Sequence, residues 1–417
     1  MTAHELAGET VLERFLRYAA FDTQSDPNSA SSPSAAKELS LAAELLEELR
    51  AMGLEASLTD TGIVYASIPA TPGLEDRPAI GMIAHMDTSP DAPGDGVSPQ
   101  IIRVTGDDIV LNREKNIVFR VGQFPEILRY AGEDVVFTDG TTLLGADDKA
   151  GIAAIMTMAA RLCANPGIAH AAISIAFTPD EEIGRGTEHF DIGRFGAAYA
   201  YTFDGGEIGE LEFENFNAAC ATLTVTGVGV HPGAAKDKMA NAARIAANFA
   251  ARLPASQAPE TTEGREGFLH PHEISGSVTQ ARVLILIRDH DKALFEAKKA
   301  FLRELAAEFA AANPRATIEL EIKDSYENMR PYVERTPAVM ALVRAAYADA
   351  GVTPVELPIR GGTDGAMLSV RGLPCPNIFT GGLNYHGIYE CLPVKSLEKA
   401  ADVAVALARR SAEVTSL

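Results

Sequence analysis

Residues 145–180 read GADDKAGIAAIMTMAARLCANPGIAHAAISIAFTPD, and this stretch decides the fold. Apolar side chains between residues 152 and 159 recur with helical spacing, which predicts a helix that begins near Asp148. The short apolar run that follows at residues 171–177 is typical of a buried strand, and a similar run precedes the helix at residues 80–86. The order strand, helix, strand predicts an α/β body with a partly parallel sheet.

Outside this stretch the chain shows two patterns of predicted secondary structure. From about residue 215 it becomes rich in short β-type runs and Ala-rich amphipathic helices, which predicts an α+β unit large enough to bury its own core. The α/β pattern then resumes, so we expect one domain inserted into another, with residues 1–214 and 324–417 forming the larger domain and residues 215–323 the insert. The other expected helices lie near residues 6–20, 35–52, 240–253, 292–311, 337–350 and 396–411, and the other expected strands near residues 63–68, 221–225 and 283–287.

Composition excludes several classes of protein. Of the 417 residues, 36 are Lys or Arg and 57 are Asp or Glu, which leaves a net charge of −21. Such a field repels phosphate backbones and anionic lipids, so we expect neither nucleic acid nor a membrane as a partner. The excess acid either keeps the protein in solution or, in part, converges on metal ions or on a cationic substrate.

The cysteines and the lengths of the apolar runs indicate the cellular compartment in which we expect the protein. The four cysteines are widely spaced and form no C-x-x-C pair, which predicts a reduced chain without a disulfide framework or a thiolate zinc site. The first six residues lack the segments of a signal peptide, and no run of about 18 apolar residues occurs. We therefore expect a cytoplasmic protein.

The first candidate site residues are His85 and Asp87, at the end of the run 80–86. Residues two apart on a strand point to the same face, so the two side chains emerge together. A metal-bound imidazole commonly donates its second N–H to a carboxylate, and Asp87 is placed for that role. A surface hydrogen bond between the two residues is the alternative interpretation.

Asp147 and Asp148 lie where a loop leads into the predicted helix. Two acids at a helix start can be ordinary N-capping residues, because they stabilise the free backbone N–H groups there. The functional alternative is a carboxylate whose two oxygens bridge two metal ions. The residues alone leave both interpretations open.

Three successive acids, Asp180, Glu181 and Glu182, follow the strand at residues 171–177. The C-terminal edge of a parallel strand is where α/β sheets bind ligands, and the mutual repulsion of the acids requires cations or solvent. Adjacent side chains point in different directions, so one Glu can bind a metal while the other handles protons. A solvated acidic turn is the alternative.

Two further residues complete the candidate set. Asp204 closes another apolar run, and His386 lies in a Gly-bounded loop near the C-terminus. The combined N and O donors, without sulfur, suit zinc, cobalt or manganese, and one shared carboxylate is typical of a two-metal hydrolytic centre. The candidate metal ligands are His85, Asp147, Glu182, Asp204 and His386.

Seven segments in a fixed order resemble the M20 metallopeptidase family, and the similarity covers essentially the whole chain. In particular they are similar to the tripeptide aminopeptidases of that family. Ile388 and Tyr389, just after His386, are less polar than the family pattern. The segments are HMDTSPD at 85–91, LLGADDKAGI at 143–152, AFTPDEEIG at 176–184, GELEFENFNAA at 209–219, HPGAAK at 231–236, PIRGGTDGA at 358–366 and LPCPNIFTGG at 373–382.

The resemblance implies a fold and a metal site. The fold is a zinc-peptidase-like catalytic domain with a mixed, largely parallel sheet, into which an α+β lid domain is inserted. Two divalent metal ions are implied, Zn²⁺ first, with Co²⁺ or Mn²⁺ as alternatives. His85, Asp147 and Asp204 would hold one ion, and Asp147 would bridge to a second ion held by Glu182 and His386.

The resemblance also assigns roles beyond the metal ligands. Asp87 and Glu181 match the two catalytic acids of the family, of which one orients a ligand and the other is the general base. His231 corresponds to a lid histidine that helps to stabilise the oxyanion. In some relatives this histidine comes from a neighbouring subunit, so the resemblance leaves open whether His231 acts within its own chain or across a homodimer.

The implied reaction is hydrolysis of the first peptide bond of a tripeptide with a free N-terminus. A metal-bridged hydroxide would attack, with Glu181 as the general base, and the acidic rim would hold the substrate ammonium. Arg360 is suited to grip the substrate carboxylate with two hydrogen bonds, unless it forms a structural ion pair with Asp364. Arg288 is a weaker second candidate for this contact.

Two other functions remain at this point. The same scaffold suits an M20-type carboxypeptidase or an N-acyl amino acid deacylase, because a two-metal centre cleaves any suitably held amide. A metal-binding protein without turnover is disfavoured, since a storage site needs no free acid such as Glu181 beside the ligand Glu182.

Overall fold

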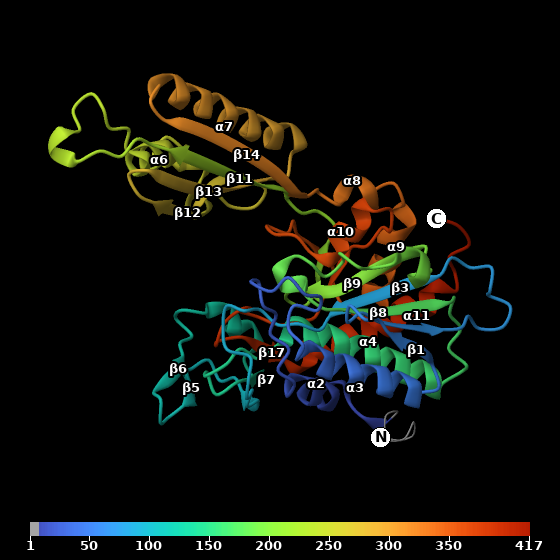
Figure 1. Cartoon of the computed structure of the whole chain (residues 1–417). Helices are drawn as coiled ribbons and strands as arrows, with labels where there is room; N and C mark the ends of the chain where they lie inside the picture. Colours follow the sequence, from blue (N-terminus) through green and yellow to red (C-terminus); the bar gives the residue numbers. More distant parts are fainter. Residues whose placement is uncertain (1–7) are drawn as a thin grey trace. The chain divides into compact units, whose positions relative to one another are not determined.

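The computed structural model describes residues 8–417 and divides into two compact units (Figure 1). Of the described residues, unit 1 comprises 8–213, Met329–Leu357 and Thr363–Leu417, and unit 2 comprises Glu214–Asn328 and Pro358–Gly362. The expected first helix near residues 6–20 begins outside the described residues, and its described part is α2 (Val11–Ala19). Thr10 and Glu13 form a capping box that starts α2.

Unit 1 is built around an eight-stranded mixed sheet with the order β1-β2-β8-β3-β9-β16-β10-β15. The neighbours β3, β8 and β9 run parallel, so their C-terminal ends meet at one edge of the sheet. The predicted fold class is confirmed. The strands are β1 (Glu55–Leu58), β2 (Val64–Ile68), β3 (Ile80–His85), β8 (Ile173–Thr178), β9 (Tyr199–Gly205), β10 (Glu210–Glu212), β15 (Val355–Glu356) and β16 (Asn377–Phe379).

The central helix of unit 1 is α4 (Ala146–Ala164), which packs on β3 and β9. Nearly all of its residues are buried, because α2 and α11 cover its outer side. Because α4 is buried on nearly all sides, its apolar residues are not confined to one face of the helix. The other helices of unit 1 are α3 (Glu38–Ala51), α5 (Ile192–Phe195), α8 (Arg330–Val333), α9 (Pro337–Asp349), α10 (Asp364–Val370) and α11 (Val394–Ser411).

Gly151 allows the first turn of α4 to approach the sheet. A Cβ atom at this position would overlap the carbonyl oxygen of Phe203 in β9 and the carboxylate of Asp148. We predict that Gly151→Ala lowers the free energy of unfolding by about 3 kcal/mol or more, because the added methyl group would force the backbone of β9 or the start of α4 to move. Urea denaturation measures this change. Gly167→Ala is the matched control, since a Cβ there meets nothing within 4 Å, and an equal loss in both variants would contradict the prediction.

Unit 1 also carries two small sheets that the sequence analysis did not predict. One has the order β17-β7-β4, and the other is the hairpin β5-β6. Their strands have only three or four residues, too short for a period to stand out. They are β4 (Gln100–Arg103), β5 (Ile109–Asn112), β6 (Ile117–Phe119), β7 (Asp134–Phe137) and β17 (Cys391–Pro393).

Unit 2 is a four-stranded antiparallel sheet, with the order β12-β13-β11-β14, on which two helices pack. Alternate residues of β11 and β13 are buried beneath the helices, as period-2 patterning requires. Its elements are β11 (Asn217–Thr226), β12 (Phe268–Gly276), β13 (Gln280–Asp289), β14 (Thr317–Tyr326), α6 (Ala242–Ala250) and α7 (Lys292–Ala312).

A short return of the chain completes unit 2. Residues 358–362 come after the helices of unit 1 have resumed, yet Ile359 forms a parallel bridge with Asn215, and its carbonyl oxygen lies 3.0 Å from His290 Nε2. Across residues 8–417, no helix is both long enough and apolar enough to cross a membrane.

Candidate metal centre

The candidate centre lies at the edge of the main sheet where parallel strands end. His85 is the last residue of β3, Asp204 lies near the end of β9, and Glu181 and Glu182 follow β8. The non-helical start of α4 supplies Asp147, and a loop between β16 and β17 supplies His386. Parallel pairing of β3 with β8 and β9 therefore explains why residues far apart in sequence meet.

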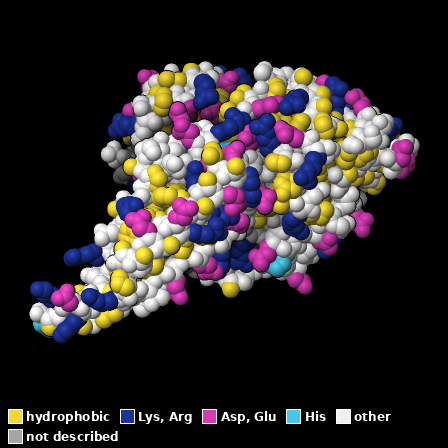
Figure 2. Space-filling view, turned by 90° about the horizontal axis from the view of Figure 1, so that it is seen from above, with side chains coloured by type: hydrophobic (Ala, Val, Ile, Leu, Met, Phe, Trp, Pro, Cys, Tyr) yellow, Lys and Arg dark blue, Asp and Glu magenta, His cyan; other side chains and the backbone are white. Residues whose placement is uncertain are grey.

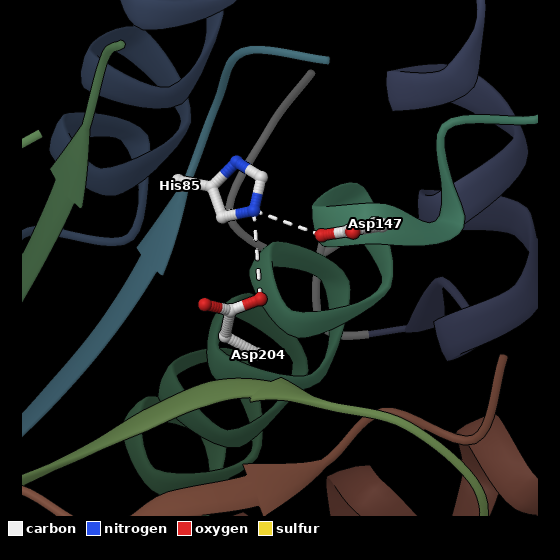
Figure 3. Close-up of side chains that lie close together, drawn as sticks. All are labelled: His85, Asp147 and Asp204. Carbon is white, nitrogen blue, oxygen red and sulfur yellow. Dashed lines mark hydrogen bonds and ion pairs between the residues drawn. The ribbon is translucent and has the colours of Figure 1, made fainter. Parts of the chain in front are cut away.

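One group of three potential ligands consists of His85, Asp147 and Asp204 (Figure 3). His85 Nε2 lies 2.8 Å from Asp147 Oδ1 and 3.5 Å from Asp204 Oδ1. The histidine is buried, and the two carboxylates are largely covered. The three donor atoms point at one another, which is the arrangement of a metal-ligand trio.

A second group consists of Asp147, Glu182 and His386. His386 Nε2 lies 3.2 Å from Asp147 Oδ2 and 3.0 Å from Glu182 Oε2. Asp147 thus belongs to both groups, with one oxygen in each. The structure brings together all five predicted metal ligands, and Asp147 is the residue that the two groups share.

The non-helical start of α4 separates the two neighbouring acids. Asp147 and Asp148 have non-helical backbone angles, and their side chains serve different purposes. Asp148 is buried and accepts hydrogen bonds from the backbone N–H of His85, at 3.1 Å, and of Gly151, at 3.2 Å. Asp148 therefore ties α4 to the end of β3, while Asp147 faces the two histidines.

Asp87 connects the histidine to the acidic turn. Its carboxylate accepts the backbone N–H of Glu181 at 2.9 Å and of Glu182 at 3.2 Å, and its Oδ1 lies 3.4 Å from His85 Nδ1. It is fully buried. The contact with the ring nitrogen opposite to the ligand nitrogen is the one expected of a residue that orients a metal-bound imidazole.

Glu181 differs from the other acids of the centre. Within residues 8–417, its carboxylate has no hydrogen bond and no ion pair, whereas Glu182 next to it contacts His386. Burial, and after it the negative charge of Asp204, raises the pKa of Glu181 well above its ordinary value. A cation nearby would act in the opposite direction and favour the carboxylate.

Burial and the crowding of negative charges without cations shift the pKa values of the ligand residues. Burial raises the pKa of Glu182 to about 7, and hydrogen bonds to Asp147 and Glu182 raise the pKa of His386 to about 11. Without cations, the carboxylates are thus compensated by protons. Because metal ligands must be deprotonated, metal binding at this site releases protons.

The donor set fits divalent metal ions. Glu182 Oε1 is buried without any hydrogen-bond partner in the described part of the chain, although a buried carboxylate oxygen is costly to leave unsatisfied. Two imidazoles and three carboxylates, arranged as two trios with one shared member, are ligands that borderline and hard cations accept.

Glu390 is a residue of this site that the sequence analysis missed. Its carboxylate is buried and accepts the backbone N–H of Leu144 at 2.7 Å, Gly145 at 2.8 Å and Asp147 at 3.1 Å. These bonds fix the loop that presents Asp147 to both histidines. The sequence signal was a lone Glu four residues after His386, directly before β17, which nothing distinguishes from a surface acid.

We predict that Glu390→Gln weakens metal binding by about 10- to 100-fold, as is typical when a residue that supports metal ligands is changed. The amide nitrogen of Gln would face a backbone donor, so residues 144–147, which lead into α4 and form its first turn, would shift. Competition with a chelator measures the affinity. Glu48→Gln is the control, because Glu48 is also buried and accepts a hydrogen bond, from Arg14 Nε at 2.9 Å. Glu48 belongs to the N-terminal helices and not to the candidate metal centre. Equal weakening by both substitutions would indicate general destabilisation instead.

The two residues that depart from the family pattern follow His386. The ring of Tyr389 packs against Phe124 and Phe119, with centroid distances of 5.1 and 6.1 Å. An apolar residue at this position is therefore explained by packing against the small sheets of unit 1.

The remaining candidates lie in unit 2. Arg360 donates to the carbonyl oxygens of Gly264 and Glu266 and to Thr262 Oγ1, and its guanidinium lies over the rings of Phe216 and Phe268. Arg288 donates to the carbonyl oxygens of Ala219 and Ile287 and lies over the ring of Tyr326. His231 is exposed, and its Nδ1 accepts the backbone N–H of Gly233. These three side chains are held within unit 2 itself.

Comparison with known proteins identifies the class. The chain belongs to peptidase family M20/M25/M40, whose model matches residues 142–410. Together with the two trios around Asp147, membership of this family supports a site for two metal ions.

Within this family, the chain is similar over its whole length to proteins named Peptidase T. The one from Parabacteroides distasonis is 51% identical over 404 residues, covering 97% of this chain and 99% of the relative. The one from Clostridium acetobutylicum is 49% identical over 408 residues, covering 97% of this chain and all of the relative. The crystal structure of an aminopeptidase PepT from Bacillus cereus has the same fold, with a TM-score of 0.75, 23% identity and coverage of 96% and 98% of the two chains.

Proposed function

We propose that the protein is a metallo-aminopeptidase that removes the N-terminal residue from tripeptides in the cytoplasm. The observation that carries the proposal is the unbonded carboxylate of Glu181 beside two ligand trios that share Asp147. The identity of about half of all residues to proteins named Peptidase T supports the same substrate class. The four cysteines are free, which fits a reducing compartment.

The metal ligands would be His85, Asp147 and Asp204 for one ion, and Asp147, Glu182 and His386 for the other. Zn²⁺ suits this set of N and O donors best, with Co²⁺ or Mn²⁺ as alternatives. Bound divalent ions supply Lewis acidity, which polarises the peptide carbonyl and makes water easier to deprotonate.

The chain's own residues do the rest. Glu181 accepts the proton of the attacking water and later donates it to the leaving amine, so it acts first as a general base and then as a general acid. Asp87 orients His85 and holds the backbone of Glu181, which fixes the position of the base. The excess of carboxylates at the centre attracts the ammonium group of a free N-terminus.

Unit 2 would act as the lid of the active site. His231 is the proposed contributor to oxyanion stabilisation, and Arg360 and Arg288 are the proposed contacts for the substrate carboxylate. Arg360 keeps part of its hydrogen-bonding capacity engaged with the loop around Gly264, so a grip on a substrate would add to these bonds or replace them. The action of His231 within one chain or across a homodimer stays a prediction.

A peptide series tests the proposal. We expect rapid hydrolysis of tri-alanine, slow hydrolysis of di- and tetra-alanine, and no hydrolysis of N-acetyl-tri-alanine, because both charged termini are recognised. Chromatography of the products shows which bond is cut. Release of the C-terminal residue, or cleavage of the acetyl group, would favour the carboxypeptidase or the deacylase instead. Amidated tri-alanine tests Arg360, because an unchanged rate would exclude a contact with the substrate carboxylate.

A further inference from the structure

A cleft in unit 2, which takes in Lys236 at the end of the HPGAAK segment but none of the candidate site residues, has an unusual lining. Its volume is about 570 Å³, and it lies between the loop before α6, the helix α6 itself and the end of α7. Three cations and three amides line it, together with apolar and small residues. The polar lining residues are Lys236, Arg244, Arg315, Asn241, Asn248 and Asn313.

The cations of this cleft differ from the ion-paired cations of unit 2. Arg252, Lys298, Lys299 and Lys323 each form an ion pair with an Asp or Glu of the same unit. In contrast, within residues 8–417 the side chains of the three cleft cations form no ion pair and no hydrogen bond. Three positive side chains without partners thus line one cavity, while Lys238, Arg282 and Arg303, which also have no ion pair in the described residues of unit 2, do not line it.

No acid lines the cleft, although acids outnumber Lys and Arg in the chain by 57 to 36. Asp237, the acid of the neighbouring loop, is exposed and is not part of the lining. Figure 2 shows dark-blue side chains gathered at the end of unit 2 that carries this loop. Three like charges around one cavity repel one another, and an anion between them would remove that repulsion.

The amides add hydrogen-bond donors. Asn241 uses its Oδ1 to accept the backbone N–H of Arg244 at the start of α6, which leaves its NH₂ group for a ligand. Asn248 makes no side-chain hydrogen bond in the part of the chain that the structure describes. Guanidinium, ammonium and amide donors around one space form a typical site for an oxyanion with several acceptor oxygens.

We propose that this cleft binds a tetrahedral oxyanion of the phosphate type, either inorganic phosphate or the phosphate group of a small metabolite. Arg244 and Arg315 supply planar forks for the oxygens, and Lys236 supplies a point charge. The volume exceeds the need of a bare phosphate and leaves space for an organic part beside the amides. The proposal does not depend on the peptidase activity.

Isothermal titration of the metal-loaded enzyme at low ionic strength tests the proposal, with inorganic phosphate, sulfate and O-phosphoserine as probes and chloride as the reference anion. We expect one binding event per chain that chloride does not reproduce. Lys236→Ala, Arg244→Ala and Arg315→Ala should each weaken it by about tenfold, because each removes a charged donor. Tighter binding of O-phosphoserine than of phosphate would identify a phosphorylated metabolite as the ligand, and equal binding would identify free phosphate.

Two control variants remove the same charge outside the cleft. Lys238 lies in the same loop as Lys236, and Arg303 lies in α7, which ends three residues before Arg315, yet neither lines the cavity. Lys238→Ala and Arg303→Ala should change the affinity by less than about twofold. Equal losses in all five variants would show a diffuse charge effect and overturn the proposal. Binding that survives the three cleft substitutions would belong to another site, such as the metal centre, and would overturn it as well.

Discussion

Glu181→Gln should abolish turnover while the protein keeps its metal ions. Gln has nearly the same shape, and the wild-type carboxylate has no hydrogen bond or ion pair in the described chain that the substitution could break. General base catalysis by a positioned side chain contributes about 10²- to 10⁴-fold, so kcat should fall by about that factor. Peptide hydrolysis and elemental analysis of the same preparation measure both effects.

The neighbouring residue provides the control for this experiment. Glu182→Gln makes the same chemical change one position away, but Glu182 contacts His386 at 3.0 Å and belongs to a ligand trio. We expect this variant to lose one metal ion as well as activity. If Glu181→Gln lost metal while Glu182→Gln kept it, the two roles would have to be exchanged. Full activity of Glu181→Gln would reject Glu181 as the base.

Asp147→Asn should weaken the binding of both metal ions, because Asp147 belongs to both ligand groups. One oxygen of Asp147 lies beside His85 and the other beside His386, so a single substitution disturbs both trios. Burial raises the pKa of this carboxyl, but hydrogen bonds from the two histidines outweigh that effect and hold the pKa below its ordinary value. We expect less than one metal ion per chain and hydrolysis at background level, measured by elemental analysis after dialysis.

Asp204→Asn is the matched substitution in one trio. It removes a ligand from the group around His85 and leaves Glu182 and His386 untouched. One tightly bound ion should therefore remain. If both variants kept the same metal content, Asp147 would not be the shared ligand.

Much of the candidate metal centre could be predicted from the sequence, because the ends of its strands can be recognised there. The apolar runs before His85, Thr178 and Asp204 are short, and each of these polar residues closes its run. Parallel pairing then brings their ends together, as the structure shows for β3, β8 and β9. The grouping of Asp147 into both trios was implied by the family resemblance and could not have come from spacing alone.

Other features depend on tertiary contacts that no local pattern reveals. Asp148 and Asp147 are identical neighbours in sequence, and only the non-helical backbone angles at the start of α4 decide that one binds the end of β3 while the other faces the histidines. Glu390 acts through backbone N–H groups more than 240 positions away. The small sheets escaped prediction because strands of three or four residues carry no measurable period.

The return of residues 358–362 to unit 2 has a consequence for dissecting the protein. A fragment that starts at residue 214 and stops at residue 328 would carry the whole four-stranded sheet but would lack the bridge at Ile359 and the cation that covers two aromatic rings. Its boundary would expose Phe216 and Phe268. A soluble, autonomous version would need this pentapeptide grafted back through a linker, and genetic exchange of the insert between relatives would have to carry both pieces together.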